Sequence, residues 1–396
     1  MTQPITPRAQ RTRRPARHAL RQLLLGALCS WLLGPTSPAA AAAPPERLLA
    51  LWPETDFSRR SVEFDEIRPG GPPRDGIPSI DRPRFDSAER AGSWLDPREP
   101  VIVVTRGVQA RAYPLQILIF HEIVNDEFDG LPLAVTFCPL CNAAIVFDRR
   151  LDGRVLEFGT TGLLRMSDLV MYDRQTASWW QQFTGRAIVG ALNGATLNQL
   201  PAQIVAFAEF RAGHPDGAVL SRDTGHRRPY GRNPYRGYDR IGNHPFLFDD
   251  PTDPRLPAME RVLNVAVGGG ERLYPFGLFR DRPLIHDELA GTPLVVMARH
   301  GTLSVLDREA IAESRAIHSA SAFDRRLDGE PLEFELRAGA IVDRATGSEW
   351  NLLGQALRGP LQGRRLRPLA GGVHFAFAWL AFNPEVEIYA APASGD

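Results

Sequence analysis

The chain has 396 residues, and its 46 basic and 46 acidic side chains give a formal net charge of zero. This balance excludes a strongly basic nucleic-acid-binding protein. Hydrophobic residues make up 43% of the chain and charged residues 23%, as in ordinary globular proteins, and the length favours two modest domains. The three cysteines are too few for a disulfide-stapled small protein or for a four-cysteine zinc ribbon within one chain.

Residues 1–43 have the three parts of an export signal, namely arginines, an apolar stretch at residues 23–33 and small residues up to Ala43. The apolar stretch is too short for a membrane span, which needs about 20 residues. We therefore expect a periplasmic or secreted protein that loses Cys29 with the signal and keeps no integral membrane segment. Cleavage removes six arginines, so the mature charge is 40 − 46 = −6. A negative mature chain disfavours nucleic acid as a partner and leaves other partners unknown.

The remaining sequence contains a diverged internal repeat. Arg111-Ala-Tyr-Pro-Leu115 recurs as Arg272-Leu-Tyr-Pro-Phe276, displaced by 161 positions. Phe147-Asp-Arg-Arg-Leu-Asp-Gly153 recurs as Phe323-Asp-Arg-Arg-Leu-Asp-Gly329. Matching blocks in the same order predict two tandem lobes with one plan. The expected organisation is a Pro/Gly/Arg-rich lead-in at 44–100 that packs on the lobes, a first lobe at 101–221, a joining segment at 222–260, a second lobe at 261–389 and a tail at 390–396.

Short β-branched and aromatic runs predict a mainly β fold with a few short helices. In the first lobe, Asp152-Gly153 predicts a tight hairpin turn, because this pair readily adopts positive φ angles. The second lobe repeats this signal at Asp328-Gly329. Apolar spacing predicts short helices at 113–124 and 202–212, and strands are expected at 101–104, 133–137, 144–147 and 155–158.

Four segments of the first lobe resemble the signatures of the exported "domain of unknown function 3179" family. They are His121-Glu-Ile-Val-Asn-Asp126, Thr136-Phe-Cys-Pro-Leu-Cys-Asn142, Asp168-Leu-Val-Met-Tyr-Asp-Arg-Gln-Thr176 and Trp179-Trp-Gln-Gln-Phe-Thr-Gly185. The resemblance covers nearly the whole mature chain and implies no particular activity, substrate or cofactor. The chain departs from the family pattern at Met166, where members usually carry a polar residue, often Asn.

Comparison of the two lobes separates shared features from features of the first lobe alone. Shared residues are most simply structural. The Cys138-Pro-Leu-Cys141 motif has no counterpart in the second lobe, and the offset of 161 places Arg282 opposite His121. Between Phe158 and Asp173 the first lobe also has six more residues than the second, fourteen against eight. The candidate site therefore lies in the first lobe.

The cysteine pair supports three interpretations. Two thiolates with the His121 imidazole suit Cu(I) or Zn(II), and Met171 is a weaker additional candidate for a copper ligand. Alternatively, the pair is a thiol/disulfide redox centre, although no thioredoxin-like βαβ pattern surrounds it. In the third interpretation, the protein is a non-catalytic two-lobed binding protein and the pair is only a structural brace.

We favour metal binding, with copper first, and leave open whether the protein is an enzyme. Cys138, Cys141 and His121 are expected to converge at a partly exposed pocket, with a loop at 159–168 beside them. Glu122 and Asp126 could accept a hydrogen bond from the imidazole.

Overall fold

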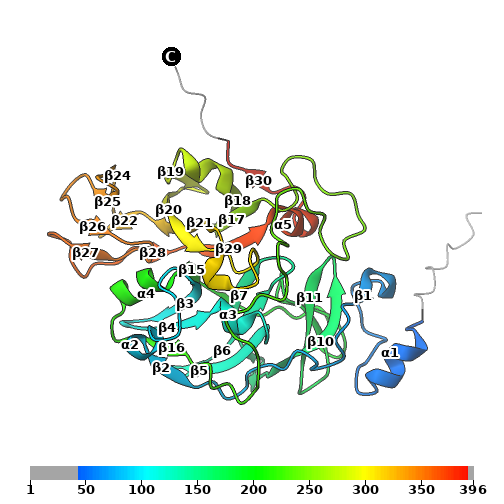
Figure 1. Ribbon diagram of the computed structural model, residues 1–396. Helices are drawn as coiled ribbons and strands as arrows, with labels where there is room; N and C mark the ends of the chain where they lie inside the picture. The colour runs from blue at the N-terminus through cyan, green and yellow to red at the C-terminus, as the bar shows by residue number, and fades with distance from the viewer. Residues whose placement is uncertain (1–42, 391–396) are drawn as a thin grey trace, which may run out of the picture. The chain divides into compact units, whose positions relative to one another are not determined.

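The computed structural model describes residues 43–390, which belong to one compact unit (Figure 1). The expected export signal at 1–43, with Cys29, lies outside these residues except for Ala43, and so does most of the tail. The described chain is mainly β with short helices, which confirms the predicted fold class. None of the helices at positions 43–390 is long and apolar enough to cross a bilayer.

The first half of the fold begins with a five-stranded sheet in the order β15-β3-β4-β16-β2. Its neighbours are antiparallel except for β4 and β16, which are parallel. A second sheet has the order β14-β7-β6-β5. The bounds are β2 Phe85–Ser87, β3 Pro100–Arg106, β4 Gln109–Pro114, β5 Ile123–Phe128, β6 Leu131–Cys138, β7 Ala143–Asp148, β14 Gln199–Leu200, β15 Gln203–Ala206 and β16 Ala218–Leu220.

A third sheet, β1-β10-β11-β12-β13, includes a strand from the lead-in segment. The small hairpin β8-β9 has its turn at Asp152 and Gly153, whose φ angles are 48° and 76°, so this predicted turn is confirmed. The bounds are β1 Ile67–Pro69, β8 Arg150–Leu151, β9 Arg154–Val155, β10 Phe158–Arg165, β11 Asp168–Asp173, β12 Trp179–Gln181 and β13 Arg186–Val189.

The second half repeats these pairings in the same order, except that β1 and β2 have no counterpart among its strands. Its sheets are β29-β17-β18-β30, β28-β21-β20-β19 and β24-β25-β26-β27, with the hairpin β22-β23. The bounds are β17 Arg261–Val267, β18 Gly270–Pro275, β19 Leu284–Leu289, β20 Thr292–Leu303, β21 Ala316–Asp324, β22 Arg326–Leu327, β23 Glu330–Pro331, β24 Phe334–Arg337, β25 Ala340–Asp343, β26 Glu349–Trp350, β27 Ala356–Arg358, β28 Arg367–Pro368, β29 Ala370–Phe375 and β30 Glu387–Ile388.

Individual residues follow the same correspondence. Phe147 pairs with Ala134, and Phe323 pairs with Val295, which lies 161 positions after Ala134. The Tyr113 hydroxyl donates to Asp126 at 2.6 Å, as Tyr274 donates to Asp287 at 2.6 Å. These matched strands and contacts agree with the repeat seen in the sequence, while descent from one duplicated unit stays a prediction.

Two sequence predictions about helices are wrong in extent. The helix expected at 113–124 is only the four-residue α3, Leu115–Leu118, and the strand β5 begins at Ile123. The helix expected at 202–212 begins later, since β15 occupies 203–206. The strand expected at 155–158 divides between β9 and β10. The other helices and 3-10 turns are α1 Glu46–Leu51, α2 Ala88–Ala91, α4 Phe207–Gly213, α5 Ala376–Phe382, η1 Phe64–Glu66, η2 Phe276–Arg280 and η3 Ile311–Glu313.

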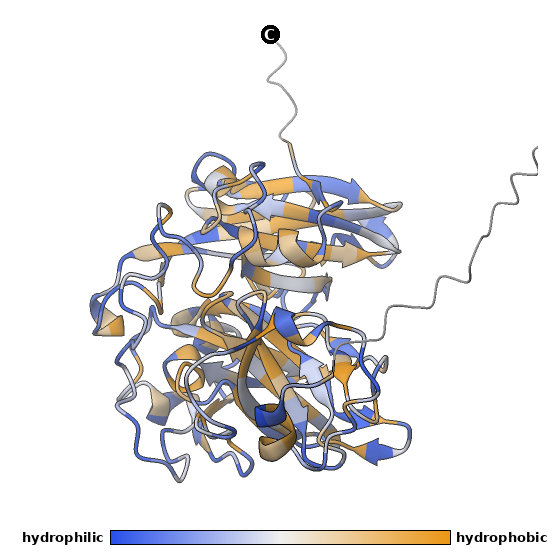
Figure 2. Cartoon of the chain, turned by 90° about the vertical axis from the view of Figure 1, so that its right-hand side faces the viewer, coloured by the Kyte–Doolittle hydropathy of each residue, from blue (hydrophilic) through white to orange (hydrophobic). Residues whose placement is uncertain are grey.

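The largest hydrophobic core joins both halves, because it contains Phe137 and Val146 from the first half and Val262 and Phe375 from the second. Figure 2 shows that much of the hydrophobic colour lies on the strands, while the connecting loops are largely hydrophilic. The lead-in segment contributes Trp52 to a separate core cluster with residues of the third sheet, so this part of the lead-in packs on the first half.

Candidate functional site

Cys138 and Cys141 lie at the tight connection between β6 and β7. Cys138 ends β6 and pairs with Ala143, and the turn closes with a hydrogen bond from the Asn142 N–H to the Pro139 carbonyl at 3.3 Å. Asn142 has a φ of 50°, which Asn tolerates better than most residues. The turn brings both thiols to the same side, and both cysteines are free and buried.

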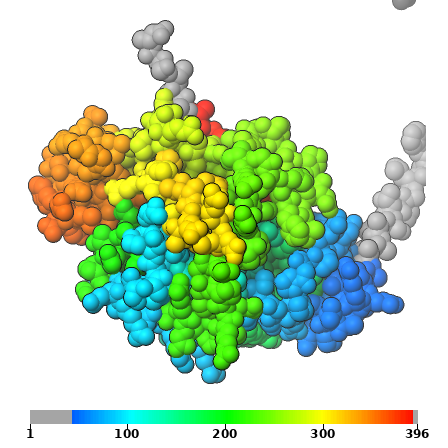
Figure 3. All heavy atoms as spheres, viewed as in Figure 1, coloured from blue at the N-terminus to red at the C-terminus, as the bar shows by residue number. Residues whose placement is uncertain are grey.

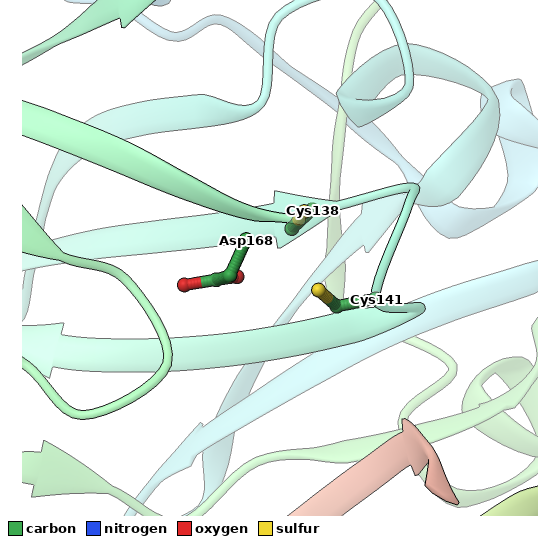
Figure 4. Close-up of side chains that lie close together, drawn as sticks. All are labelled: Cys138, Cys141 and Asp168. Atoms are coloured by element: carbon green, nitrogen blue, oxygen red, sulfur yellow. The ribbon is translucent and has the colours of Figure 1, made fainter. Parts of the chain in front are cut away.

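The hairpin β10-β11 brings a second set of groups to the cysteines (Figure 4). Arg165 pairs with Asp168, so the connection has only two residues, Met166 and Ser167, with φ angles of 51° and 64°. Two positive φ angles in a two-residue connection define a type I′ turn. The segment expected as a loop at 159–168 is therefore mostly strand β10 and this turn, and it does lie beside the cysteines.

The turn places a backbone carbonyl and a carboxylate next to the sulfurs. The Ser167 carbonyl accepts from the Cys141 thiol at 3.5 Å and from the Cys138 thiol at 3.9 Å. One Sγ from each cysteine and one carboxylate oxygen of Asp168 all lie within 4.8 Å of one another. All three side chains are buried. This limit accommodates the separation of roughly 3.8 Å between ligands around a tetrahedral zinc ion.

Only one oxygen of Asp168 has hydrogen-bond partners. Its Oδ2 accepts from Gln181 Nε2 at 2.6 Å and from the Phe183 N–H at 2.9 Å. Its Oδ1 is buried and has no hydrogen-bond partner of good geometry among residues 43–390, although both thiols lie close enough to Asp168 to favour its charged form. A buried carboxylate oxygen without a partner is costly, so an orphaned one beside two thiols marks a position where a further group is expected.

Four acidic groups share this buried region. Burial is the main cause that raises the pKa of Asp168 to about 7 and that of Glu122 to about 8, and the neighbouring Asp168 charge adds to the rise at Glu122. Burial also raises the pKa of the Cys138 thiol and raises that of Cys141 well above its usual range. Within the described chain, no arginine or histidine forms an ion pair with Glu122 or Asp168. The site is therefore rich in potential anions and lacks a protein cation.

His121 is held by other contacts. Its Nδ1 lies 2.7 Å from the Pro78 carbonyl, and its Nε2 lies 2.6 Å from the Tyr230 hydroxyl. Neither Glu122 nor Asp126 contacts the ring, and the ligand group that the structure brings together has Asp168 as its third member. His121 could bind a metal with the sulfurs only by giving up one of its two present partners.

Two further expectations about the site need correction. The sulfurs were expected at a partly exposed pocket, but Cys138 is 1% exposed and Cys141 is fully buried. Met171, the weaker candidate for a copper ligand, is fully buried in the large core. It follows Asp168 by three positions on β11, and strand alternation directs the two side chains to opposite faces. The Met171 side chain therefore serves core packing.

Sequence reasoning missed Asp168 as a partner of the cysteines, although two signals pointed to it. Asp168 opens one of the family-like segments, and it belongs to the stretch that is six residues longer in the first half than in the second. In the second half the corresponding hairpin turns at Ala338 and Gly339, where β24 meets β25. The longer hairpin of the first half is what carries a carboxylate to the thiols.

The type I′ turn predicts the effect of two substitutions. Asn tolerates positive φ better than Met or Ala, so Ala338→Asn on the exposed second-half turn should stabilise the protein by about 1 kcal/mol. Met166→Asn should gain less, about 0.5 kcal/mol, because Met166 also packs partly buried against the core. Urea denaturation of both variants measures the change in the free energy of unfolding. A loss of stability in Ala338→Asn would contradict the account of the turn.

Comparison with known proteins places the chain in a family. No curated protein and no solved structure matches the chain. A family model described as "Protein of unknown function (DUF3179)" matches residues 74–386, which include both cysteines, Asp168 and most of the two halves. The chain therefore belongs to the DUF3179 family.

Proposed function

We propose that Cys138, Cys141 and Asp168 bind one zinc ion. The observation that carries this proposal is the buried, unpartnered Oδ1 of Asp168, which lies beside two thiols in a region without a protein cation. Buried anions are unstable unless a positive charge compensates them. A divalent ion supplies that charge, and it binds the thiolate and carboxylate forms of these groups.

The set of donor atoms favours zinc over copper. Zinc accepts cysteine sulfur and carboxylate oxygen in the same tetrahedral site. Cu(I) prefers soft sulfur donors, which would leave the hard oxygen of Asp168 unused. The presence of Asp168 in place of His121 thus changes the preferred metal from the copper expected from the sequence.

Thiol redox chemistry has less support than metal binding. A thiol that exchanges with disulfides needs a low pKa and access for its partner. Here burial raises the pKa of both thiols, and neither sulfur reaches the surface. A structural brace also has less support, since the two cysteines are free.

Three protein ligands leave one tetrahedral position for another group. Structural zinc sites usually have four protein ligands, whereas catalytic sites keep an open position for water or substrate. Among the described residues, Glu122 is an acid whose charge raises the pKa of Cys138 and whose own pKa is raised by the charge of Asp168. The open position and Glu122 together favour a reactive site over a purely structural one.

Metal analysis tests the proposal. Protein purified without chelators or a His-tag should contain about one zinc per chain. Cys138→Ser and Cys141→Ser should each lower zinc affinity more than about 100-fold, because even outer partners of a metal site contribute about 10-fold to 100-fold.

His121→Ala and Met171→Leu are the matched controls, and both should keep zinc. If His121→Ala folds normally but loses zinc, His121 is a zinc ligand after all. A reducible disulfide and no bound metal in the unmodified protein would instead support the redox interpretation.

A further inference from the structure

A cavity of about 790 Å³ lies next to the proposed metal site. Three parts of the chain form its walls: the lead-in at 70–77, the hairpin β10-β11, and the joining segment at 234–247. Figure 3 shows the yellow-green joining segment above the blue lead-in on the right-hand side, and an ion pair between Arg68 and Asp249 at 2.5 Å links the two segments. A volume of this size is typical of sites for small organic molecules.

Four residues of the cavity floor are chain neighbours of the proposed ligands or lie close enough to interact with them electrostatically. Leu140 precedes Cys141, and Leu169 follows Asp168, so both are direct chain neighbours of ligands. Tyr235 and Glu122 also line the cavity. Burial raises the pKa of Tyr235, and the charges of Glu122 and Cys138 raise it further, which places this phenol near both groups.

Glu122 is the most unusual residue of the floor. It is 7% exposed, and no hydrogen bond or ion pair to its carboxyl group occurs among the residues that the structure describes. Its φ of 58° is left-handed and costs energy for a residue with a side chain. Strained backbone and unpartnered buried acids are both common at binding and catalytic sites. Glu122 therefore lacks a partner on the side that faces the cavity.

The rest of the wall determines the kind of molecule that fits. Half of the lining residues have apolar side chains, among them Leu163, Leu164, Phe246 and Leu247, while Arg236, Asn243 and His244 add polar groups on the joining segment. Apolar walls with a few polar groups are the usual design of a pocket that orients an organic molecule by its polar end.

We propose that this cavity binds a small, mostly apolar organic molecule whose polar end, such as a carboxamide, hydrogen-bonds to Glu122. The apolar part lies along the leucines of β10. The polar end then lies beside the open metal position, a link that rests on the proposed function. Glu122 is positioned to accept a hydrogen bond from that end.

Isothermal titration calorimetry with two amides tests the cavity without involving the metal. Octanamide should bind the full-length protein at least about 100-fold more tightly than acetamide, because its six additional methylenes leave water. Leu163→Trp fills part of the cavity. It should lower the affinity for octanamide more than about 10-fold, because the tail loses space. Leu336→Trp, at a 45% exposed position on β24, is the control and should leave the affinity for octanamide unchanged.

A second pair of variants tests Glu122. Glu122→Leu removes the hydrogen bond and should weaken octanamide about 10-fold, whereas Glu122→Gln retains a partner and should largely preserve the affinity. Glu127→Leu, at an exposed position on β5, the strand that follows Glu122, is the control. Equal affinities for octanamide and acetamide, or equal losses in Leu163→Trp and Leu336→Trp, would overturn the proposal.

Octanohydroxamic acid separates this proposal from the proposed function. It has the same tail as octanamide and an end that chelates zinc, so it should bind more tightly than octanamide only when zinc is present. If the tail effect holds but the chelating end adds nothing to zinc-loaded protein, the cavity proposal stands and its link to the metal is wrong. If zinc is bound but the tail effect is missing, the metal site stands and the cavity proposal is wrong.

Discussion

Replacing Asp168 with asparagine should stabilise the metal-free protein at neutral pH and, at the same time, severely weaken zinc binding. The asparagine carbonyl can still accept from Gln181 and Phe183, so the hydrogen bonds of Oδ2 are kept. The buried carboxylate charge and its unpartnered oxygen are removed. Because a neutral amide is a poor ligand for zinc, we expect the affinity to fall more than about 100-fold.

The stability gain has a defined pH dependence. Burial raises the pKa of Asp168 from 3.8 to about 7 in the folded protein, so the folded state holds a proton that the unfolded chain has released. The stabilisation from this proton is complete below about pH 4 and is lost as the pH rises through about 7. Asparagine does not titrate. The free energy of unfolding of Asp168→Asn should therefore exceed that of the unsubstituted protein only slightly at pH 4 and by about 2–4 kcal/mol at pH 8.

Urea denaturation of chelator-treated protein at pH 4 and pH 8 measures both values. Asp129→Asn, which removes one carboxylate from the exposed turn between β5 and β6, is the surface control. Added zinc should stabilise the unsubstituted protein at pH 8 and not Asp168→Asn, since only the former binds it. A variant less stable than the parent at pH 8 without metal would contradict the account of an uncompensated carboxylate.

Gly162→Ala should be among the most destabilising single substitutions outside the core. Gly162 has a φ of 74°, and a Cβ there would lie 2.0 Å from the Pro72 carbonyl oxygen. The backbone of the lead-in would have to move away from β10, where the Gly70 N–H donates to the Gly162 carbonyl at 2.8 Å. We expect a loss of more than about 3 kcal/mol from strain and overpacking together.

Gly153→Ala is the matched control. Gly153 has a φ of 76°, almost the same backbone strain, but nothing lies within 4 Å of its added Cβ. Its loss should be about 1 kcal/mol, the cost of the left-handed conformation alone. Thermal and urea denaturation of the two variants separates the contribution of φ from that of close packing. Equal losses would show that the approach of Pro72 has no energetic importance.

Local patterns predicted the strands at 101–104, 133–137 and 144–147 and the Asp-Gly hairpins, because these depend on neighbouring residues. The helix expected at 113–124 failed for a physical reason. Residues 112–119 and 121–126 are all buried, so apolar side chains occur on every side and their spacing cannot distinguish a buried helix from a buried strand. Tertiary packing decided the outcome: α3 ends after one turn, and β5 pairs with β6 from Ile123 onward.

The candidate site was predicted in part. The Cys138–Cys141 turn could be found because both ligands lie in one short motif. Asp168 is 27 residues beyond Cys141, and only the folded hairpin β10-β11 brings it to the sulfurs. His121 is close in sequence, but its ring turns to Pro78 and Tyr230, which belong to the lead-in and the joining segment. Contacts with such connecting segments have no signature in sequence spacing.

One hydrogen bond shows that the cysteine site of the first half depends on the second half. The Phe375 N–H, on β29 of the second half, donates to the Cys141 carbonyl at 2.9 Å. A fragment that stops after Ser221 would leave this carbonyl without its partner and would expose the core surface that Val262 and Phe375 cover. The second half thus holds the Cys138–Cys141 turn of the first half in place. Metal binding at this turn should therefore be studied in the intact chain.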